Sequence, residues 1–197
     1  MTTNELKLIL LYEYNEVCYS GGAKGADRLF GEWAMQNNFA VVHFSFKGHN
    51  HSVDENLILE LPNYMLNNQT VISQLKMANS TLQRSIPKPG SYVYNLLARN
   101  SFQIMVTERV YCISPLASPT QVQGGTAWAV QMYIDANPNV EIYCFDPSDG
   151  LVYQYSSSTR EFEAVESIPR PHGRWTGIGT RNATKHDMER LVRYFRG

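Results

Sequence analysis

The sequence predicts an α/β fold in three layers, with a mainly parallel β-sheet between two layers of helices. Residues 16–46 and residues 109–146 carry this prediction, because each stretch has a strand, a glycine turn, a helix and a second strand. Parallel strands need a crossover connection of about a dozen residues, and a helix usually supplies it. A chain of 197 residues has the length of one domain and can bury a core without disulfides or a metal. We therefore expect a single domain over residues 1–197.

The first elements follow from apolar spacing. Thr3 or Asn4 can cap a helix in which Leu6, Ile9 and Leu10 recur at helical intervals. A short strand EVCYS, the glycine turn SGGAKGAD, the helix DRLFGEWAMQNN and the strand FAVVHFSF follow. The strand, helix and strand of this stretch form a βαβ unit with a right-handed crossover.

Residues 48–90 interrupt this alternation. The polar segment KGHNHSVDEN precedes two mixed helical stretches, at about 57–66 and 69–83, and IPKPG ends them in a turn. We expect a helical excursion here. His49 and His51 lie in the polar segment without a third metal ligand nearby, so we expect loop residues and no metal or cofactor site.

The second half repeats the pattern and then changes it. A helix at 91–105, a strand at 109–115, a helix from the glycines at 124 to 138 and a strand at 140–146 complete the parallel part. LVYQYSS and REFEAVES alternate apolar and polar residues, which predicts a hairpin attached to the sheet. RWTGIGTR predicts a further strand, and residues 182–197 predict an amphipathic helix with one apolar face: Met188, Leu191, Val192 and Phe195.

Composition excludes several classes of protein. The chain has 17 Lys and Arg against 18 Asp and Glu, so no overall positive field attracts nucleic acid or an anionic membrane. No apolar run approaches the ~18 residues of a membrane span. Cys18, Cys112 and Cys144 each stand in an apolar stretch, which is typical of buried, reduced thiols in a cytoplasmic protein.

Three glycine turns carry the chemistry. Each follows a strand, so all three are expected at the carboxyl edge of the sheet, around one crevice. Glycine lets the backbone approach a ligand closely, and free N–H groups at the start of a helix bind phosphate. The spacings are neither that of a Walker loop nor GxGxxG. The candidate ligand-binding residues of the turns are Ser20, Gly21, Gly22, Ala23, Lys24, Gly25, Asp27, Gly124, Gly125, Thr126, Trp128, Gly179, Thr180 and Arg181.

Alternatives remain for several of these residues. A glycine turn can be purely structural, and Asp27 can act as a general base, contact its helix or bind a ribose hydroxyl. Trp128 can stack on a base or belong to the core. Arg181 can bind a phosphate or pair with a carboxylate of the protein.

The order of these motifs resembles the SLOG superfamily of Rossmann-like proteins. That superfamily includes the DNA-processing protein A family, the cytokinin-activating nucleoside-monophosphate phosphoribohydrolases, molybdenum-cofactor carriers and phage-encoded members. The phage-type pattern GIGSR, SGGAxGAD, LxARNxxQ and GGTxxA is similar to GIGTR, SGGAKGAD, LLARNSFQ and GGTAWA in this chain. The resemblance covers residues 17–145 and 175–196. In those relatives GIGSR precedes SGGAxGAD, whereas here GIGTR is near the C-terminus, so we expect a circular permutation.

The resemblance implies a nucleotide-binding domain and adds Arg99 and Asn100 to the ligand-binding set. Arg99 matches the catalytic Arg of the phosphoribohydrolases, but Ala129 stands where those enzymes have their Glu, and the nearest later acid is Asp135. N-glycosidic cleavage needs a carboxylate. We therefore expect binding of a nucleotide or nucleotide-derived signal rather than catalysis, with hydrolysis of nucleoside 5'-monophosphates as the alternative.

The resemblance also bears on partners and location. It implies self-association, and for a phage protein a cytoplasmic role in the host, sensing or sequestering a nucleotide second messenger. A DNA-associated role like that of the DNA-processing branch is disfavoured by the neutral charge and the lack of a basic stripe.

Overall fold

An eight-stranded sheet forms the centre of the molecule. The structure, a computed structural model, describes residues 1–196. The strand order is β3-β2-β1-β11-β4-β7-β8-β9, parallel from β3 to β7 and antiparallel at β8 and β9. The strands of this sheet are β1 (Val17–Ser20), β2 (Ala40–Phe46), β3 (Ile58–Leu61), β4 (Arg109–Ile113), β7 (Ile142–Phe145), β8 (Val152–Ser156), β9 (Glu161–Val165) and β11 (Arg174–Gly179).

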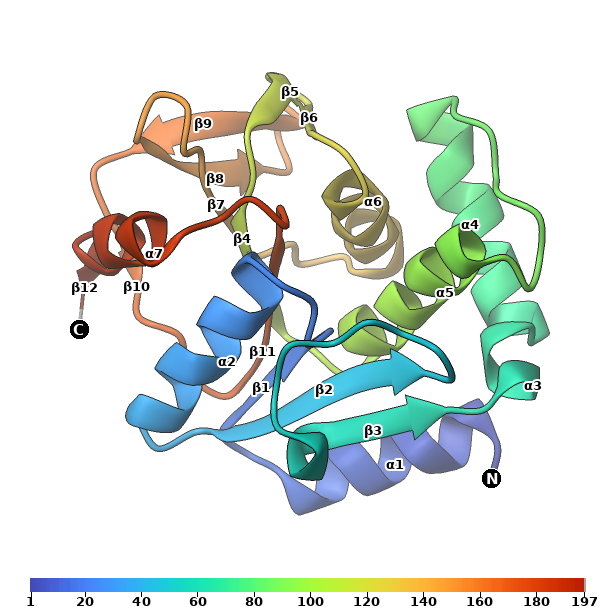
Figure 1. The fold of residues 1–197 in the computed structure, drawn as a ribbon. Coiled ribbons are helices and arrows are strands. Elements are labelled where there is room, and N and C mark those ends of the chain that lie inside the picture. The colour runs from blue at the N-terminus through green and yellow to red at the C-terminus, as the bar shows by residue number, and fades with distance from the viewer. Residues whose placement is uncertain (197) are drawn as a thin grey trace.

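Helices cover both faces of the sheet, which confirms the three-layer α/β prediction (Figure 1). α2 and α7 pack on one face, around Phe30, Trp175 and Leu191. On the other face lie α1, α5 and α6, with α4 packed against α5 and α6. The helices are α1 (Thr3–Glu13), α2 (Ala26–Gln36), η1 (Glu55–Leu57), α3 (Asn63–Leu66), α4 (Gln69–Leu82), α5 (Tyr92–Met105), α6 (Thr126–Ala136) and α7 (Lys185–Val192).

The central strands are buried on both faces. In β1, Tyr19 belongs to the core beside α1 and α5, whereas the adjacent Cys18 belongs to the core beside α2. This alternation is the period of two of a strand, and the two helical layers explain why the strand reads as a continuous apolar run. Cys112 and Cys144 are buried as well, and all three thiols are unpaired.

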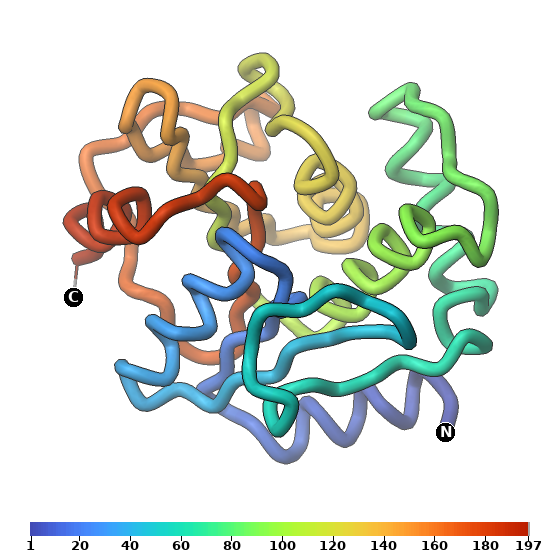
Figure 2. The backbone as a smooth tube through the Cα atoms, viewed as in Figure 1, coloured from blue at the N-terminus to red at the C-terminus, as the bar shows by residue number. Residues whose placement is uncertain are grey.

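β11 lies between β1 and β4, although sixty or more residues separate it from either along the chain. Figure 2 shows this red segment beside the blue and green ones. β11 is parallel to β1, with Trp175 opposite Cys18, so the predicted neighbourhood of these two strands is confirmed. Counted from β11, the order of β2, β1, β11, β4 and β7 becomes 3-2-1-4-5, the order of a doubly wound nucleotide-binding fold.

Several expected elements differ from the structure. The helix expected at about 57–66 is wrong for Ile58–Leu61, which forms edge strand β3 beside β2. The final helix ends at Val192, and Phe195 instead belongs to β12 (Phe195–Arg196), which pairs with β10 (Ile168–Pro169). In both places pairing with a neighbouring strand overrides the local helical pattern.

Smaller corrections concern caps and loops. The cap of α1 is Thr2 rather than Thr3 or Asn4, and its side chain accepts a hydrogen bond from the Glu5 N–H. The expected loop after β4 contains a small hairpin of β5 (Leu116–Ser118) and β6 (Gln121–Val122). The predicted hairpin is confirmed as β8 and β9 at the sheet edge.

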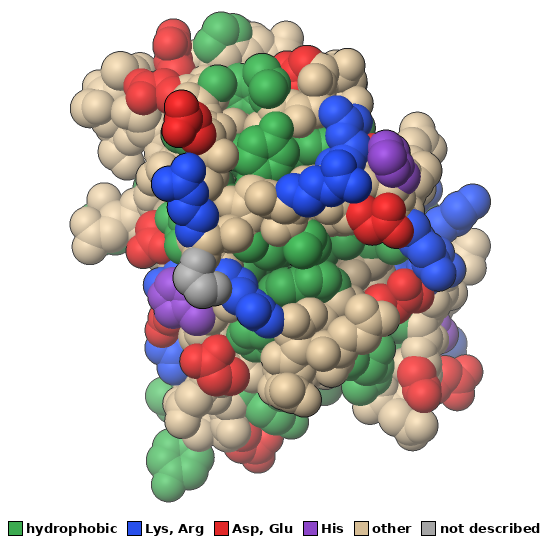
Figure 3. All heavy atoms as spheres, turned by 90° about the vertical axis from the view of Figure 1, so that its left-hand side faces the viewer, with side chains coloured by type: hydrophobic (Ala, Val, Ile, Leu, Met, Phe, Trp, Pro, Cys, Tyr) green, Lys and Arg blue, Asp and Glu red, His purple; other side chains and the backbone are tan. Residues whose placement is uncertain are grey.

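Charges of both signs are mixed over the face shown in Figure 3. Basic side chains also lie over aromatic rings: Arg170 lies over Trp33 and Arg190 over Phe145. Such pairs hold the guanidinium groups against the protein. Within residues 1–196, each helix is too short or too polar to cross a bilayer.

Candidate functional site

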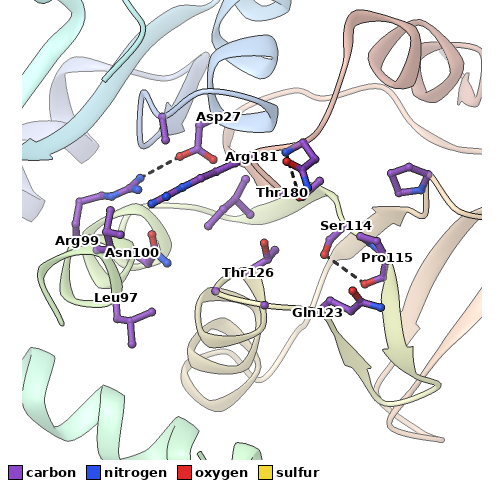
Figure 4. Close-up of a pocket in the computed structure, with 18 of the residues that line it drawn as sticks. Asp27, Leu97, Arg99, Asn100, Ser114, Pro115, Gln123, Thr126, Thr180 and Arg181 are labelled. Carbon is purple, nitrogen blue, oxygen red and sulfur yellow. Dashed lines mark hydrogen bonds and ion pairs between the residues drawn. The ribbon is translucent and has the colours of Figure 1, made fainter. Parts of the chain in front are cut away.

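A cavity of about 620 Å³ opens at the carboxyl ends of the central strands. From the centre of the sheet, the chain adds β1, β2 and β3 in one direction and β4, β7 and β8 in the other. The cavity lies between these two halves, beside β11 and β4. Open α/β sheets bind ligands at such a switch point, and this volume lies within the range of small-molecule sites. Figure 4 shows the side chains that converge on it from α2, α5, α6 and the segments after β4 and β11.

The start of α6 forms one wall. Gly124, Gly125 and Thr126 line the cavity, and Gly124 has a φ of +64°, which favours glycine. No side chain caps the helix at Gly125. A Cβ at either glycine would meet nothing within 4 Å. The first N–H groups of α6 are therefore available to an anion in the cavity.

α5 forms the opposite wall. Val93, Leu96, Leu97 and Asn100 line the cavity from α5, and their spacing of three and four residues places them on one helix face. Asn100 is 6% exposed, and its Oδ1 has no hydrogen-bond partner in the described chain. This wall offers an apolar surface with one amide at its inner end.

A buried ion pair joins α2 to α5 at the back of the cavity. Arg99 Nη1 lies 3.2 Å from Asp27 Oδ2 and 3.0 Å from Gln103 Oε1. Both charged side chains are about 95% buried. Burial raises the pKa of Asp27, and the Arg99 guanidinium acts in the opposite direction. Because the carboxyl is held by Arg99, it is fixed in place beside the cavity.

The first glycine turn packs mainly against the protein itself. An added Cβ at Gly21 would lie 1.1 Å from Arg99 Nη1, so glycine makes room for the ion pair. A Cβ at Gly22 would meet Val53 at 2.9 Å, and one at Gly25 would meet two backbone carbonyls of the third turn at 2.5 Å. These glycines build the site but do not line the cavity.

The third turn closes over the first. The Ala26 N–H donates to the Thr180 carbonyl at 3.1 Å, and the Thr180 N–H donates to the Ile113 carbonyl at 2.8 Å. Thr180 and Arg181 line the cavity with Gly179. No ion pair of Arg181 is found within residues 1–196, and Figure 4 shows its side chain extending between Asp27 and Asn100.

Ten of the sixteen residues expected at the site line one cavity, and six do not. The ten are Ala23, Asp27, Arg99, Asn100, Gly124, Gly125, Thr126, Gly179, Thr180 and Arg181. Ser20 is buried and donates to the Gly177 carbonyl, and Lys24 is exposed. The remaining four are Gly21, Gly22 and Gly25 in the first turn, and Trp128, which is 4% exposed in the core.

The cavity also has lining residues that the sequence reasoning missed. Ser114 and Pro115 directly follow β4, and Gln123 precedes α6. Their position after a central strand or before a glycine turn is a signal that could have found them. Asn182 and Asp187 also line the cavity, but nothing local in the sequence distinguishes them from surface residues.

The acid that N-glycosidic cleavage would need is absent from the expected place. Ala129 is fully buried in the core side of α6. Asp135 bonds to Gln131 at 2.8 Å and does not line the cavity. Of the two lining carboxylates, Asp27 pairs with Arg99 and Asp187 accepts from the cap residue Thr184.

The fold and the cavity define an α/β protein with a ligand-sized site at a topological switch point. Comparison with family models, curated proteins and solved structures finds no match to the chain. Among residues 1–196, no group of three His, Cys, Asp or Glu side chains is placed to hold a metal ion.

Proposed function

We propose that this chain binds a nucleotide or a nucleotide-derived signalling ligand in the cavity. The observation that carries the proposal is the convergence of the second and third glycine turns with Arg99 and Asn100 around a single cavity of about 620 Å³. A phosphate would accept hydrogen bonds from the first N–H groups of α6 and pair with Arg181. The base would lie along the apolar wall of α5, with Ile178 beside it.

The SLOG resemblance is part of this proposal, together with a circular permutation of the phage-type chain. Two features support the permutation: the 3-2-1-4-5 order when β11 is counted first, and the position of α7 on the same face as α2. A right-handed crossover from β11 to β1 requires its helix on that face. Self-association and a role in sensing or sequestering a nucleotide messenger in the cytoplasm of a phage host belong to the same proposal.

The test begins with the ligand that the protein carries. Purified protein is denatured, the released small molecules are identified by mass spectrometry, and the identified nucleotide is titrated back by calorimetry. Gly125→Val is the matched variant, because its side chain would enter open space at the cavity wall. Binding by the native chain and loss in folded Gly125→Val support the proposal. No bound nucleotide and no affinity for a nucleotide panel would overturn it.

A second candidate function is hydrolysis of the N-glycosidic bond of a nucleoside 5'-monophosphate. It is favoured by one observation, the cavity-lining Asp27 carboxyl whose pKa burial raises and which contacts Arg99. Adenine release from AMP, measured by chromatography and abolished in Asp27→Asn, would favour this activity.

A further inference from the structure

The segment after α4 brings an unexpected cation to the start of α6. Arg84 Nη1 donates to the Gly124 carbonyl at 2.7 Å. Arg84 belongs to the insertion between β2 and α5, whereas Gly124 belongs to the second glycine turn. No residue from 54 to 92 lines the cavity, so Arg84 contacts the turn without being part of the cavity lining.

The approach of Arg84 is fixed locally. α4 packs alongside α6 and ends at Leu82, and the following cap residue Gln83 has a left-handed φ of +50°. Asn79 then holds the end of the helix: its carbonyl accepts from the Gln83 N–H at 2.8 Å, and its Oδ1 accepts from the Arg84 N–H at 3.0 Å. These contacts fix the backbone of Arg84 at the end of α4, and the guanidinium reaches the Gly124 carbonyl from there.

The contact sets the direction of the peptide between Gly124 and Gly125. In a trans peptide the carbonyl and the following N–H point in opposite directions. Because the Gly124 carbonyl faces Arg84, the Gly125 N–H faces away from Arg84, and Gly125 itself lines the cavity. Glycine at φ +64° permits this orientation but does not enforce it, and a Cβ added at Gly124 would meet nothing within 4 Å.

We infer that Arg84 is a positioning residue that holds the second glycine turn in an anion-binding conformation. The inference rests on the proposed function, and it assigns the cavity's phosphate end to α6. Asn100 on the facing wall is 94% buried, and its Oδ1 has no hydrogen-bond partner among residues 1–196, which independently indicates that the cavity takes a polar ligand. The helical insertion, which lines none of the cavity, would thus act on the ligand through this one contact.

The experiment titrates the native chain and three variants with inorganic phosphate and with AMP. Arg84→Ala removes the contact, Arg84→Lys keeps a charged donor, and Lys88→Ala removes one exposed cation of the same segment without a contact to α6. A hydrogen bond from a charged group is worth enough to predict roughly ten-fold weaker phosphate binding in Arg84→Ala. We expect a smaller loss in Arg84→Lys and less than about a two-fold change in Lys88→Ala.

The outcomes separate this inference from the proposed function. Phosphate affinity in Arg84→Ala within two-fold of the native value, or an equal loss in Lys88→Ala, overturns the role of Arg84. If the native chain binds phosphate but no nucleotide, the proposed function fails and the phosphate series still decides on Arg84. If the native chain binds neither phosphate nor a nucleotide, both proposals fail. Melting temperatures are measured alongside, and if Arg84→Ala does not fold, the folded Arg84→Lys variant decides: weaker phosphate binding than in the native chain supports the role of Arg84, and native affinity overturns it.

Discussion

Gly21→Ala is expected to break the ion pair at the back of the cavity. The added Cβ would lie 1.1 Å from Arg99 Nη1, 2.1 Å from Arg99 Cζ and 2.4 Å from Asp27 Oδ2. These separations are too short for any small adjustment, so the guanidinium must move away from the carboxylate. Both side chains are about 95% buried, and movement would leave two charges without their partners.

The magnitude follows from that burial. Leaving one charge of a buried ion pair without its partner lowers the free energy of unfolding by about 3–5 kcal/mol, which is a large part of the stability of an ordinary domain. For a chain of this length each kcal/mol lowers the melting temperature by about 2–4 °C. We therefore expect the melting temperature of Gly21→Ala to fall by roughly 6–20 °C, measured by circular dichroism and by urea unfolding.

Gly125→Ala is the matched control, because it is a glycine of the same cavity whose Cβ would meet nothing within 4 Å. Its φ of −67° suits alanine, so its free energy of unfolding should stay within about 1 kcal/mol of the native value. The double variant Gly21→Ala with Arg99→Ala should lose less stability than the two single losses added together, since the clash with Arg99 disappears and only the contact with Asp27 Oδ2 remains. If the two single losses of stability simply added in the double variant, or if Gly21→Ala had the native melting temperature, the clash with the ion pair would be refuted.

Three further outcomes are expected. Burial lowers the pKa of His43 from 6.5 to about 4, so as the pH falls the unfolded state takes up a proton on this residue before the folded state does. The contribution of His43 to the free energy of unfolding is therefore complete above about pH 6.5 and falls by up to about 3 kcal/mol toward pH 4. A His43→Asn variant unfolded in urea across this range should show a flatter dependence of stability on pH. Gly179→Ala should lower the free energy of unfolding by more than about 2 kcal/mol, because its Cβ would lie 2.1 Å from the Ile113 carbonyl oxygen between paired strands. Gly124→Ala is the comparison: it is strained only by its positive φ and should lower the free energy of unfolding by about 1 kcal/mol in the same denaturation series. Incubation with AMP should release no adenine above background, because Ala129 offers no carboxylate; adenine release that Arg99→Ala abolishes would contradict this.

Local pattern was sufficient for most elements of the fold. The two strand, glycine turn, helix and strand units are present, and so is the hairpin of β8 and β9. The spacing of apolar residues and the positions of glycines reflect preferences of the local backbone, which depend only on residues a few positions apart. Such preferences can be read from the sequence without knowing any tertiary contact. The strand at Ile58–Leu61 was missed because its pairing partner β2 lies more than ten residues away.

The site divides in the same way. The residues alone located the glycine turns, because glycine is a property of single positions, and the family resemblance added Arg99. Only the tertiary structure decided that Gly21 serves the Arg99 and Asp27 pair, that Trp128 faces the core, and that Arg84 contacts the second turn. Each of these depends on which distant segments pack together, and burial of apolar surface over the whole chain determines that packing.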